Sequence, residues 1–234
     1  MKKIMAIVPA RGGSKSIPKK NLALLAGNPL IAYTIKTAIN SKMFDSIIVS
    51  TDSKEIAKVS MSFGAQVPFI RPKHLATDQT PGVDPIIHAI TWMKENKNYC
   101  PDCIMCLQPT SPLRNEKDII KSIKILTEKS ANSVVSVTTI KHHPFWMKKI
   151  DKQGYMHDFV TQEQPIHRRQ DLPSLYALNG AIYATKTNLF LEVKSWFPQS
   201  TYAYIMPPER SVDIDTPWDL QLAGLVLNNK QKNS

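Results

Sequence analysis

Short apolar runs alternate with longer segments of helical spacing along most of this 234-residue chain, and this alternation constrains the fold more than any other feature. Runs of buried-strand length occur at residues 4–8, 47–49, 103–107, 134–137, 179–184 and 202–206, and a turn and strand are expected at 61–69. Apolar spacing predicts helices over 30–39, from Lys54, over 83–94 and 116–129, and after Pro217. Such alternation predicts an α/β fold, a mostly parallel sheet with helices on both faces and its strand-end loops at one edge.

The alternation stops between residues 141 and 178. Prolines, histidines, aromatic residues and charges follow one another there without a clean period. An irregular stretch of this length is more often a functional excursion than a random loop. We therefore expect one domain over residues 1–234, with an inserted arm at about 141–178.

A cationic loop with two glycines directly follows the first predicted strand. Gly12 and Gly13 allow a tight turn that presents N–H groups to an anion. The neighbouring cations, which would neutralise a polyphosphate, are Arg11, Lys15, Lys19 and Lys20. The loop has neither G-x-G-x-x-G nor a complete Walker A pattern, but it lies where open α/β sheets bind their ligands. It predicts a nucleotide triphosphate site; the alternative is a solvated basic turn.

Two acidic residues lie near the other end of the sequence. Asp213 and Asp215 are separated by the apolar Ile214, so an extended backbone would direct both carboxylates to the same side. Carboxylates in this arrangement suit Mg²⁺, which takes one or two of them together with phosphate oxygens and water. The alternative is a pair of helix-entry acids favoured by the helix dipole. A triphosphate loop in the same chain favours the metal site.

Three further polar residues are candidates for substrate contacts. Gln108 belongs to a proline-stiffened loop at a strand end. Such a loop loses little entropy when it binds a ligand, which favours a substrate contact. The alternative interpretation is an ordinary proline turn. Arg169 in the arm suits a substrate carboxylate or is a surface cation. Asn179 positions a sugar hydroxyl or closes a turn before Gly180.

Composition narrows the classes of partner and compartment. The net charge of +11 permits an acidic partner, but the basic residues form no tract interleaved with aromatics, which argues against nucleic acid. No apolar window approaches a membrane span, so no membrane partner is expected. Cys100, Cys103 and Cys106 lack a fourth metal ligand nearby and are interpreted as reduced thiols, which fits a cytoplasmic protein.

Six motifs occur in one order along nearly the whole chain, namely VPARGGSKSIPKKN, STDS, QPTSPLR, RRQDLP, NGAIYA and DIDTPWD. Together they closely resemble the acylneuraminate cytidylyltransferases, or CMP-sialic acid synthetases. The resemblance implies transfer of CMP from CTP to the anomeric hydroxyl of a nonulosonic sugar acid, with release of pyrophosphate. It also implies Mg²⁺ or Mn²⁺, a Rossmann-like nucleotidyltransferase fold, and a homodimer in which the arm of one subunit reaches the active site of the other.

The resemblance also implies roles for individual residues. It implies nucleotide contacts at Arg11, Ser14, Lys15, Lys20 and Asn21, and sugar contacts at Gln108 and Arg169. From the loop and turn sequences themselves we also expect nucleotide contacts at Ala10, Gly12 and Gly13 and a sugar contact at Asn179. Catalytic roles fall on Arg11, Lys20, Asp213 and Asp215, and the last two match the family's metal-binding aspartates.

The identity of the sugar acid stays open between N-acetylneuraminate and legionaminate. Sialic acid enzymes of this family carry an arginine two residues before the asparagine of NGAIY, whereas this chain has Ala177. The segment RRQDLPSLYALNGAIY is more similar to versions that handle legionaminic acid. The alternatives are a cytidylyltransferase for 3-deoxy-manno-octulosonate and a non-catalytic nucleotide- or RNA-binding protein, which would bind with a steep salt dependence and without turnover.

Overall fold

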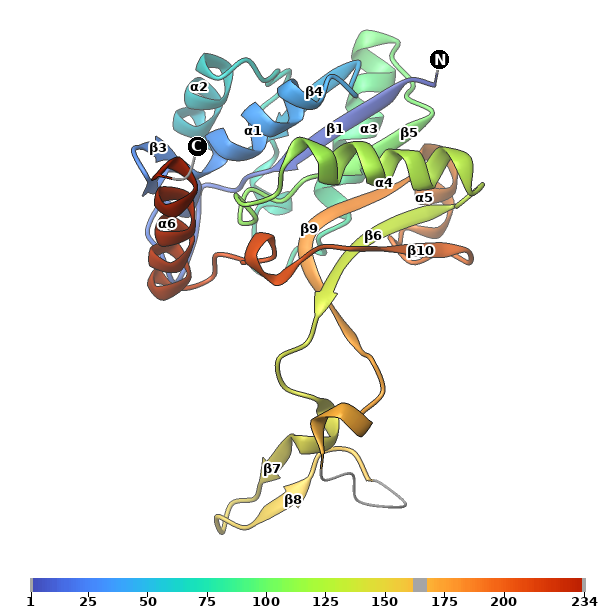
Figure 1. Ribbon diagram of the computed structural model, residues 1–234. Helices are drawn as coiled ribbons and strands as arrows, with labels where there is room; N and C mark the ends of the chain where they lie inside the picture. The colour runs from blue at the N-terminus through green and yellow to red at the C-terminus, as the bar shows by residue number, and fades with distance from the viewer. Residues whose placement is uncertain (1, 162–167, 233–234) are drawn as a thin grey trace.

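A six-stranded sheet forms the centre of the molecule, in a computed structural model that describes residues 2–161 and 168–232, without the side chains of residues 169 and 230–232. Its strands are β1 (Ile4–Pro9), β4 (Ser46–Ser50), β5 (Cys103–Cys106), β6 (Ser133–Thr139), β9 (Tyr176–Lys186) and β10 (Thr201–Ile205). The helices are α1 (Leu30–Ser41), α2 (Lys54–Ser62), α3 (Asp84–Lys97), α4 (Glu116–Glu128), α5 (Thr187–Val193) and α6 (Pro217–Lys232). Figure 1 shows helices on both sides of this sheet.

The sheet is mostly parallel, as the sequence predicts. The strand order is β10-β6-β9-β5-β1-β4. β1 pairs in parallel with β4 and β5, β10 pairs in parallel with β6, and β9 runs antiparallel to both of its neighbours. The carboxyl ends of β1, β4 and β5 therefore lie at one edge, and the loops that follow them meet there.

Both faces of the sheet are buried, which explains the continuous apolar character of its strands. On β1, Ile4, Ala6 and Val8 pack in one core with residues of α1, α2 and α4. Met5 and Ile7 point to the other face, where they pack with α3 and with Phe190 of α5.

One local prediction was wrong, and one helix was not predicted. No strand forms at residues 65–69, where Gln66 makes a single parallel bridge with Ile48. Pro68 explains this difference, because it has no N–H with which to continue the ladder. Helix α5 was not predicted; it begins at Thr187 directly after β9 and buries Phe190.

A large bulge interrupts the pairing of β6 with β9. Val135 pairs with Tyr183 and Val137 with Leu178, so residues 179–182 lie opposite Ser136 alone. The Ser136 hydroxyl accepts from the Ile182 N–H at 2.8 Å and donates to Asn179 Oδ1 at 2.6 Å. One buried hydroxyl thus stabilises the backbone of the bulge, which lies beside the predicted site.

Beyond the bulge, residues 140–161 and 168–175 between β6 and β9 project away from the sheet as an arm (Figure 1). It carries a small antiparallel hairpin of β7 (Lys148–Ile150) and β8 (Met156–Asp158). Several large apolar side chains on the arm are exposed, among them Ile150 at 72%, Tyr155 at 69% and Met156 at 71%. Within residues 2–161 and 168–232, no helix combines the length and apolarity that crossing a bilayer requires.

Replacing Ser136 by alanine should destabilise the fold by about 2 kcal/mol, because the buried Ile182 N–H would lose its acceptor. Urea unfolding measures the change. Ser122→Ala is the matched control, because the buried Ser122 hydroxyl only donates to the Asp118 carbonyl within α4. Equal stability losses in the two variants would contradict this role of Ser136.

Candidate active site

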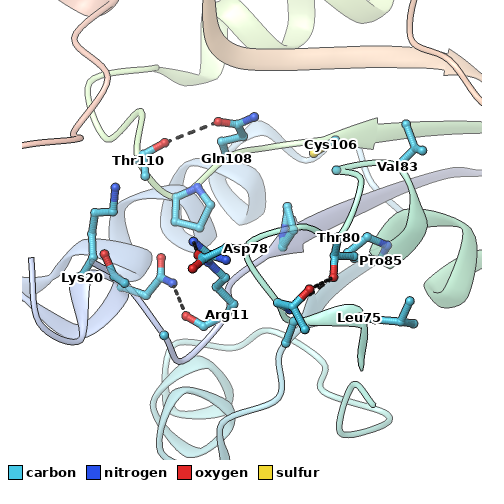
Figure 2. A pocket seen from close by; sticks show the side chains of 18 of the residues that line it. Arg11, Lys20, Leu75, Asp78, Thr80, Val83, Pro85, Cys106, Gln108 and Thr110 are labelled. Atoms are coloured by element: carbon cyan, nitrogen blue, oxygen red, sulfur yellow. Dashed lines mark hydrogen bonds and ion pairs between the residues drawn. The ribbon is translucent and has the colours of Figure 1, made fainter. Parts of the chain in front are cut away.

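The loops after β1 and β5, and residues 71–85 that lead from α2 into α3, border a cleft of about 730 Å³ at the carboxyl edge of the sheet (Figure 2). Of the residues predicted from sequence, those that line it are Arg11, Gly13, Ser14, Lys15, Lys20, Asn21, Gln108 and Asp215. The cleft thus brings together residues from the first and last parts of the chain.

The cationic loop and the acidic segment touch inside this cleft. Lys20 Nζ lies 3.0 Å from Asp215 Oδ1 and donates to the Ile214 carbonyl at 2.9 Å. The Ser16 hydroxyl donates to the Asp215 carbonyl. The side chain of Lys20 is only 16% exposed, so its ammonium group is directed along the cleft wall toward the acids.

The glycines of the loop have different roles. A Cβ at Gly12 would lie 3.1 Å from Ser53 Cβ, so this glycine permits close packing against the chain after β4. Its N–H donates to Asp52 Oδ1 at 2.8 Å, and this donor is therefore not directed to a phosphate. A Cβ at Gly13 would meet nothing within 4 Å, and Gly13 borders the cleft.

Asp78 pairs with two cations of the loop. Its carboxylate lies 2.7 Å from Arg11 Nη2 and 2.9 Å from Lys15 Nζ, and Figure 2 shows Asp78 beside Arg11 in the cleft. Hydrogen bonds from Lys15 and Arg11 hold the pKa of Asp78 below its usual value. Sequence analysis missed this acid, because nothing in the segment TDQTPG shows that it folds over the first loop.

Asp213 is a partly desolvated carboxylate beside Gln108. Its Oδ1 is buried and has no hydrogen-bond partner, and burial raises the pKa of this carboxyl group above its usual value. Gly180, at φ +72°, makes the approach possible, because a Cβ there would lie 3.3 Å from Asp213 Oδ2 and 3.1 Å from Gln108 Oε1.

The two aspartates fit a hard divalent cation. Asp213 Oδ1 is buried without a hydrogen-bond partner, so a bound cation would compensate its negative charge. The Asp215 side chain is 73% exposed and can reach the same cation. Within the described part of the chain, no three His, Cys, Asp or Glu residues form a metal-binding group. A cation here would therefore take its remaining ligands from phosphate and water, as Mg²⁺ commonly does.

The other predicted contacts lie farther from the cleft or support it. Ala10 is fully buried and donates its N–H to the Ser50 carbonyl, and Asn21 Nδ2 donates to the Arg11 carbonyl at 2.9 Å. Asn179 is 4% exposed and donates to Ser211 Oγ at 2.9 Å, so its amide is engaged by protein atoms. Arg169 begins a short 3₁₀ helix of the arm, and its side chain lies outside the described part of the structure.

An apolar wall, also missed by sequence analysis, completes the cleft. It is formed by Leu178, Tyr183, Trp196 and Phe197. The Trp196 ring packs against Phe190 and Tyr183, with centroids 4.4 and 5.6 Å away, while Phe197 is 53% exposed. Cys106 also borders the cleft, but burial raises the pKa of its thiol to about 12, which makes it a poor nucleophile at neutral pH.

Comparison with known proteins identifies the family. The sequence model of one family, described as "Cytidylyltransferase", matches residues 5–231. The chain belongs to the cytidylyltransferase family. The expected membership is thus confirmed, and the match spans both the cationic loop and the acid pair.

Several relatives of this cytidylyltransferase have sugar-specific names. It is 37% identical to a CMP-N,N'-diacetyllegionaminic acid synthase of Legionella pneumophila, over 98% of each chain. It is 33% identical to a pseudaminic acid cytidylyltransferase of Campylobacter jejuni, over 96% of each chain. An N-acylneuraminate cytidylyltransferase of Streptococcus agalactiae is 38% identical over 92% of this chain but only 51% of its own length.

Solved structures confirm the nucleotidyltransferase fold. A CMP-2-keto-3-deoxy-manno-octonic acid synthetase, solved in complex with CTP, matches with a TM-score of 0.70 and 18% identity over 97% of this chain and 99% of its own. A 4-diphosphocytidyl-2C-methyl-D-erythritol synthase of Anaerococcus prevotii matches with a TM-score of 0.67 and 16% identity, over 97% of this chain and 99% of its own.

Replacing Asp213 by asparagine should raise the melting temperature at neutral pH. The pKa of Asp213 in the folded state lies above its usual value, so the protonated carboxyl group stabilises the folded state. This contribution to the free energy of unfolding is lost as pH rises through the raised pKa. Removing the buried charge should therefore stabilise the protein above this pH and give no such gain below the usual pKa of the carboxyl. Calorimetry over pH measures this, and Asp215→Asn at the exposed neighbour is the control. A lower melting temperature for Asp213→Asn at neutral pH would contradict the assigned desolvation of the Asp213 carboxylate.

Proposed function

We propose that this protein transfers CMP from CTP to the anomeric hydroxyl of a nonulosonic sugar acid and releases pyrophosphate. The observation that carries the proposal is the contact of the cationic loop with the acidic segment in one cleft, where Lys20 pairs with Asp215; Asp213 is two residues away on the same segment. A metal-bound triphosphate needs both groups, cations for its phosphates and carboxylates for its metal. The names of the relatives in this family agree with that chemistry.

The proposed roles of the site residues follow from their charges. Arg11, Lys15 and Lys20 bind the triphosphate and stabilise negative charge that moves onto the departing pyrophosphate. Asp213 and Asp215 hold Mg²⁺ or Mn²⁺, which supplies charge neutralisation at the phosphate oxygens. Gln108 lies next to Asp213, where it can orient the hydroxyl that attacks the α-phosphorus.

The acceptor site fits an acylated, partly apolar sugar acid. The wall of Leu178, Tyr183 and Phe197 faces the same cleft as Gln108, and such a surface packs against methyl and acetamido groups. Ala177 leaves this chain without the arginine found in sialic acid enzymes. We therefore favour a legionaminic-acid-type substrate, with N-acetylneuraminate as the second candidate. The likeness to the octonic acid synthetase, at 18% identity, supports the fold alone.

The arm supports a homodimeric assembly. Its exposed side chains Ile150, Tyr155 and Met156 form apolar surface that a second subunit would cover, which would also bring Arg169 to the neighbouring cleft. For a CTP-dependent enzyme that binds small acidic substrates we further propose a cytoplasmic location, without a nucleic-acid or membrane partner.

The proposed function is tested with a panel of acceptors incubated with CTP and Mg²⁺. Legionaminic acid, N-acetylneuraminate, pseudaminic acid and 3-deoxy-manno-octulosonate are compared by release of pyrophosphate and formation of the CMP-sugar. We expect the highest kcat/KM with legionaminic acid and at least tenfold less with the eight-carbon acid, which leaves the apolar wall partly uncovered. CTP binding with a steep salt dependence but no turnover on any acceptor would instead favour a non-catalytic nucleotide-binding protein.

Asp78→Asn should tighten the binding of CTP about tenfold. Asp78 competes with the triphosphate for Arg11 and Lys15, and its neutral replacement would release both cations without loss of volume. Arg11→Ala should weaken the binding of CTP and lower kcat/KM at least tenfold, because it removes one of the two cations. Calorimetric titration with CTP measures affinity, and Glu55→Asn, which frees Lys19 outside the cleft lining, is the control. Weaker CTP binding by Asp78→Asn would show that Asp78 assists the nucleotide rather than competing with it.

A further inference from the structure

The two aspartates proposed to hold the metal lie on a segment without regular structure. Strand β10 ends at Ile205 and helix α6 begins at Pro217, and between them only residues 208–210 form a short 3₁₀ turn. The directions of the Asp213 and Asp215 carboxylates therefore depend on a few specific contacts made by residues 206–216, not on a ladder of backbone hydrogen bonds.

Upstream of the acids, an ion pair between the buried Asp118 and the partly exposed Arg210 anchors this segment to helix α4. Arg210 donates to both oxygens of Asp118, from Nη2 to Oδ1 at 2.8 Å and from Nε to Oδ2 at 3.1 Å. Asp118 is fully buried, and it also accepts from Tyr204 Oη at 2.9 Å and from the Asn115 N–H at 2.9 Å. A bidentate pair fixes the orientation of the guanidinium group as well as its distance.

Two further contacts fix the backbone on either side of Asp213. Ser211 Oγ accepts from Asn179 Nδ2 at 2.9 Å and donates to the Pro207 carbonyl at 2.9 Å. Ile214 donates its N–H to the Thr110 carbonyl at 2.8 Å, and its side chain is fully buried. Before Asp213, Arg210 is anchored to α4 and Ser211 to the bulge. After Asp213, Ile214 is anchored to the loop after β5.

We propose that Asp118 and Arg210 are positioning residues for the metal site, which set the direction of the Asp213 and Asp215 carboxylates. The inference rests on the proposed function, because it gives those two carboxylates a cation to bind. A buried ion pair adds little net stability compared with apolar residues of similar size, but it selects one geometry. Arg210 is three residues from Asp213 and next to Ser211, so the ion pair and the Ser211 contacts together hold the turn that leads to the carboxylate. Neither Asp118 nor Arg210 borders the cleft, so the pair acts through the segment.

The test replaces the pair by apolar residues in the double variant Asp118→Leu/Arg210→Met, which removes both charges and leaves none unpaired. Arg210→Lys, which keeps the charge but loses the bidentate geometry, is the conservative variant. Ile123→Ala, in the core face of the same helix α4, is the control for lost stability alone. Mn²⁺ binding in the presence of CTP is measured by electron paramagnetic resonance, and CTP binding without metal by calorimetry.

In the double variant we expect Mn²⁺ affinity to fall about tenfold, the usual effect of removing residues that orient metal ligands. Metal-free CTP affinity should stay within about twofold, since the cationic loop is untouched, and Arg210→Lys should recover part of the metal affinity. Ile123→Ala should bind Mn²⁺ as the wild type does. Unchanged Mn²⁺ affinity in the double variant, or an equal loss in Ile123→Ala, would overturn the proposal.

The same measurements separate this inference from the proposed function. Wild-type protein that binds Mn²⁺ with CTP but transfers CMP to no acceptor would refute the proposed function, while the variants would still decide the positioning role. Wild-type protein that turns over substrate, with variants that bind Mn²⁺ normally, would refute the positioning role alone.

Discussion

The candidate site depends on opposite charges held face to face at one edge of a mostly parallel sheet. A cluster of cations on a single loop repels itself, and in this protein the repulsion is offset by Asp78 against Arg11 and Lys15 and by Asp215 against Lys20. The acids come from distant parts of the sequence, since Asp78 lies between α2 and α3 and Asp215 follows β10, and only the folded chain brings both to the loop after β1. Under the proposed function, a triphosphate would enter this cleft together with its metal, because both sets of charges would then exchange partners rather than lose them.

Polar contacts, and not the apolar core, fix the fine geometry around this cleft. Arg114 is an example: its guanidinium is buried, and it donates to the Ala181 carbonyl at 2.6 Å and to Thr34 Oγ1 at 2.8 Å. Burial lowers the pKa of Arg114 to about 10, which leaves it charged at neutral pH. It therefore joins α1, the bulge of β9 and the loop that carries Gln108. Ser136, Asn179 and Asp118 act in the same way on the neighbouring segments.

Sequence analysis predicts the layered fold because its cause is visible locally. Strands buried on both faces must be apolar along their length, so β1, β4 and β5 stand out from the helices that separate them. The exceptions have local causes too: Pro68 prevents a strand that the apolar residues around it suggest. The long-range pairing of Asp118 with Arg210 has no such trace, because each is an ordinary charged residue in its own neighbourhood. For the same reason sequence analysis missed Asp78 and did not predict the hydrogen bond from the Gly12 N–H to Asp52.

The most direct measurement of the central claim is the linkage between CTP and Mg²⁺. Calorimetric titration of CTP with and without Mg²⁺ gives the coupling free energy, and by reciprocity each ligand must tighten the other if both bind in one cleft. The account predicts at least fivefold tighter CTP binding with Mg²⁺ in the wild type, and no tightening when Asp213 and Asp215 are both replaced by alanine. Equal CTP affinity with and without Mg²⁺ in the wild type, or full coupling in the double alanine variant, would contradict it.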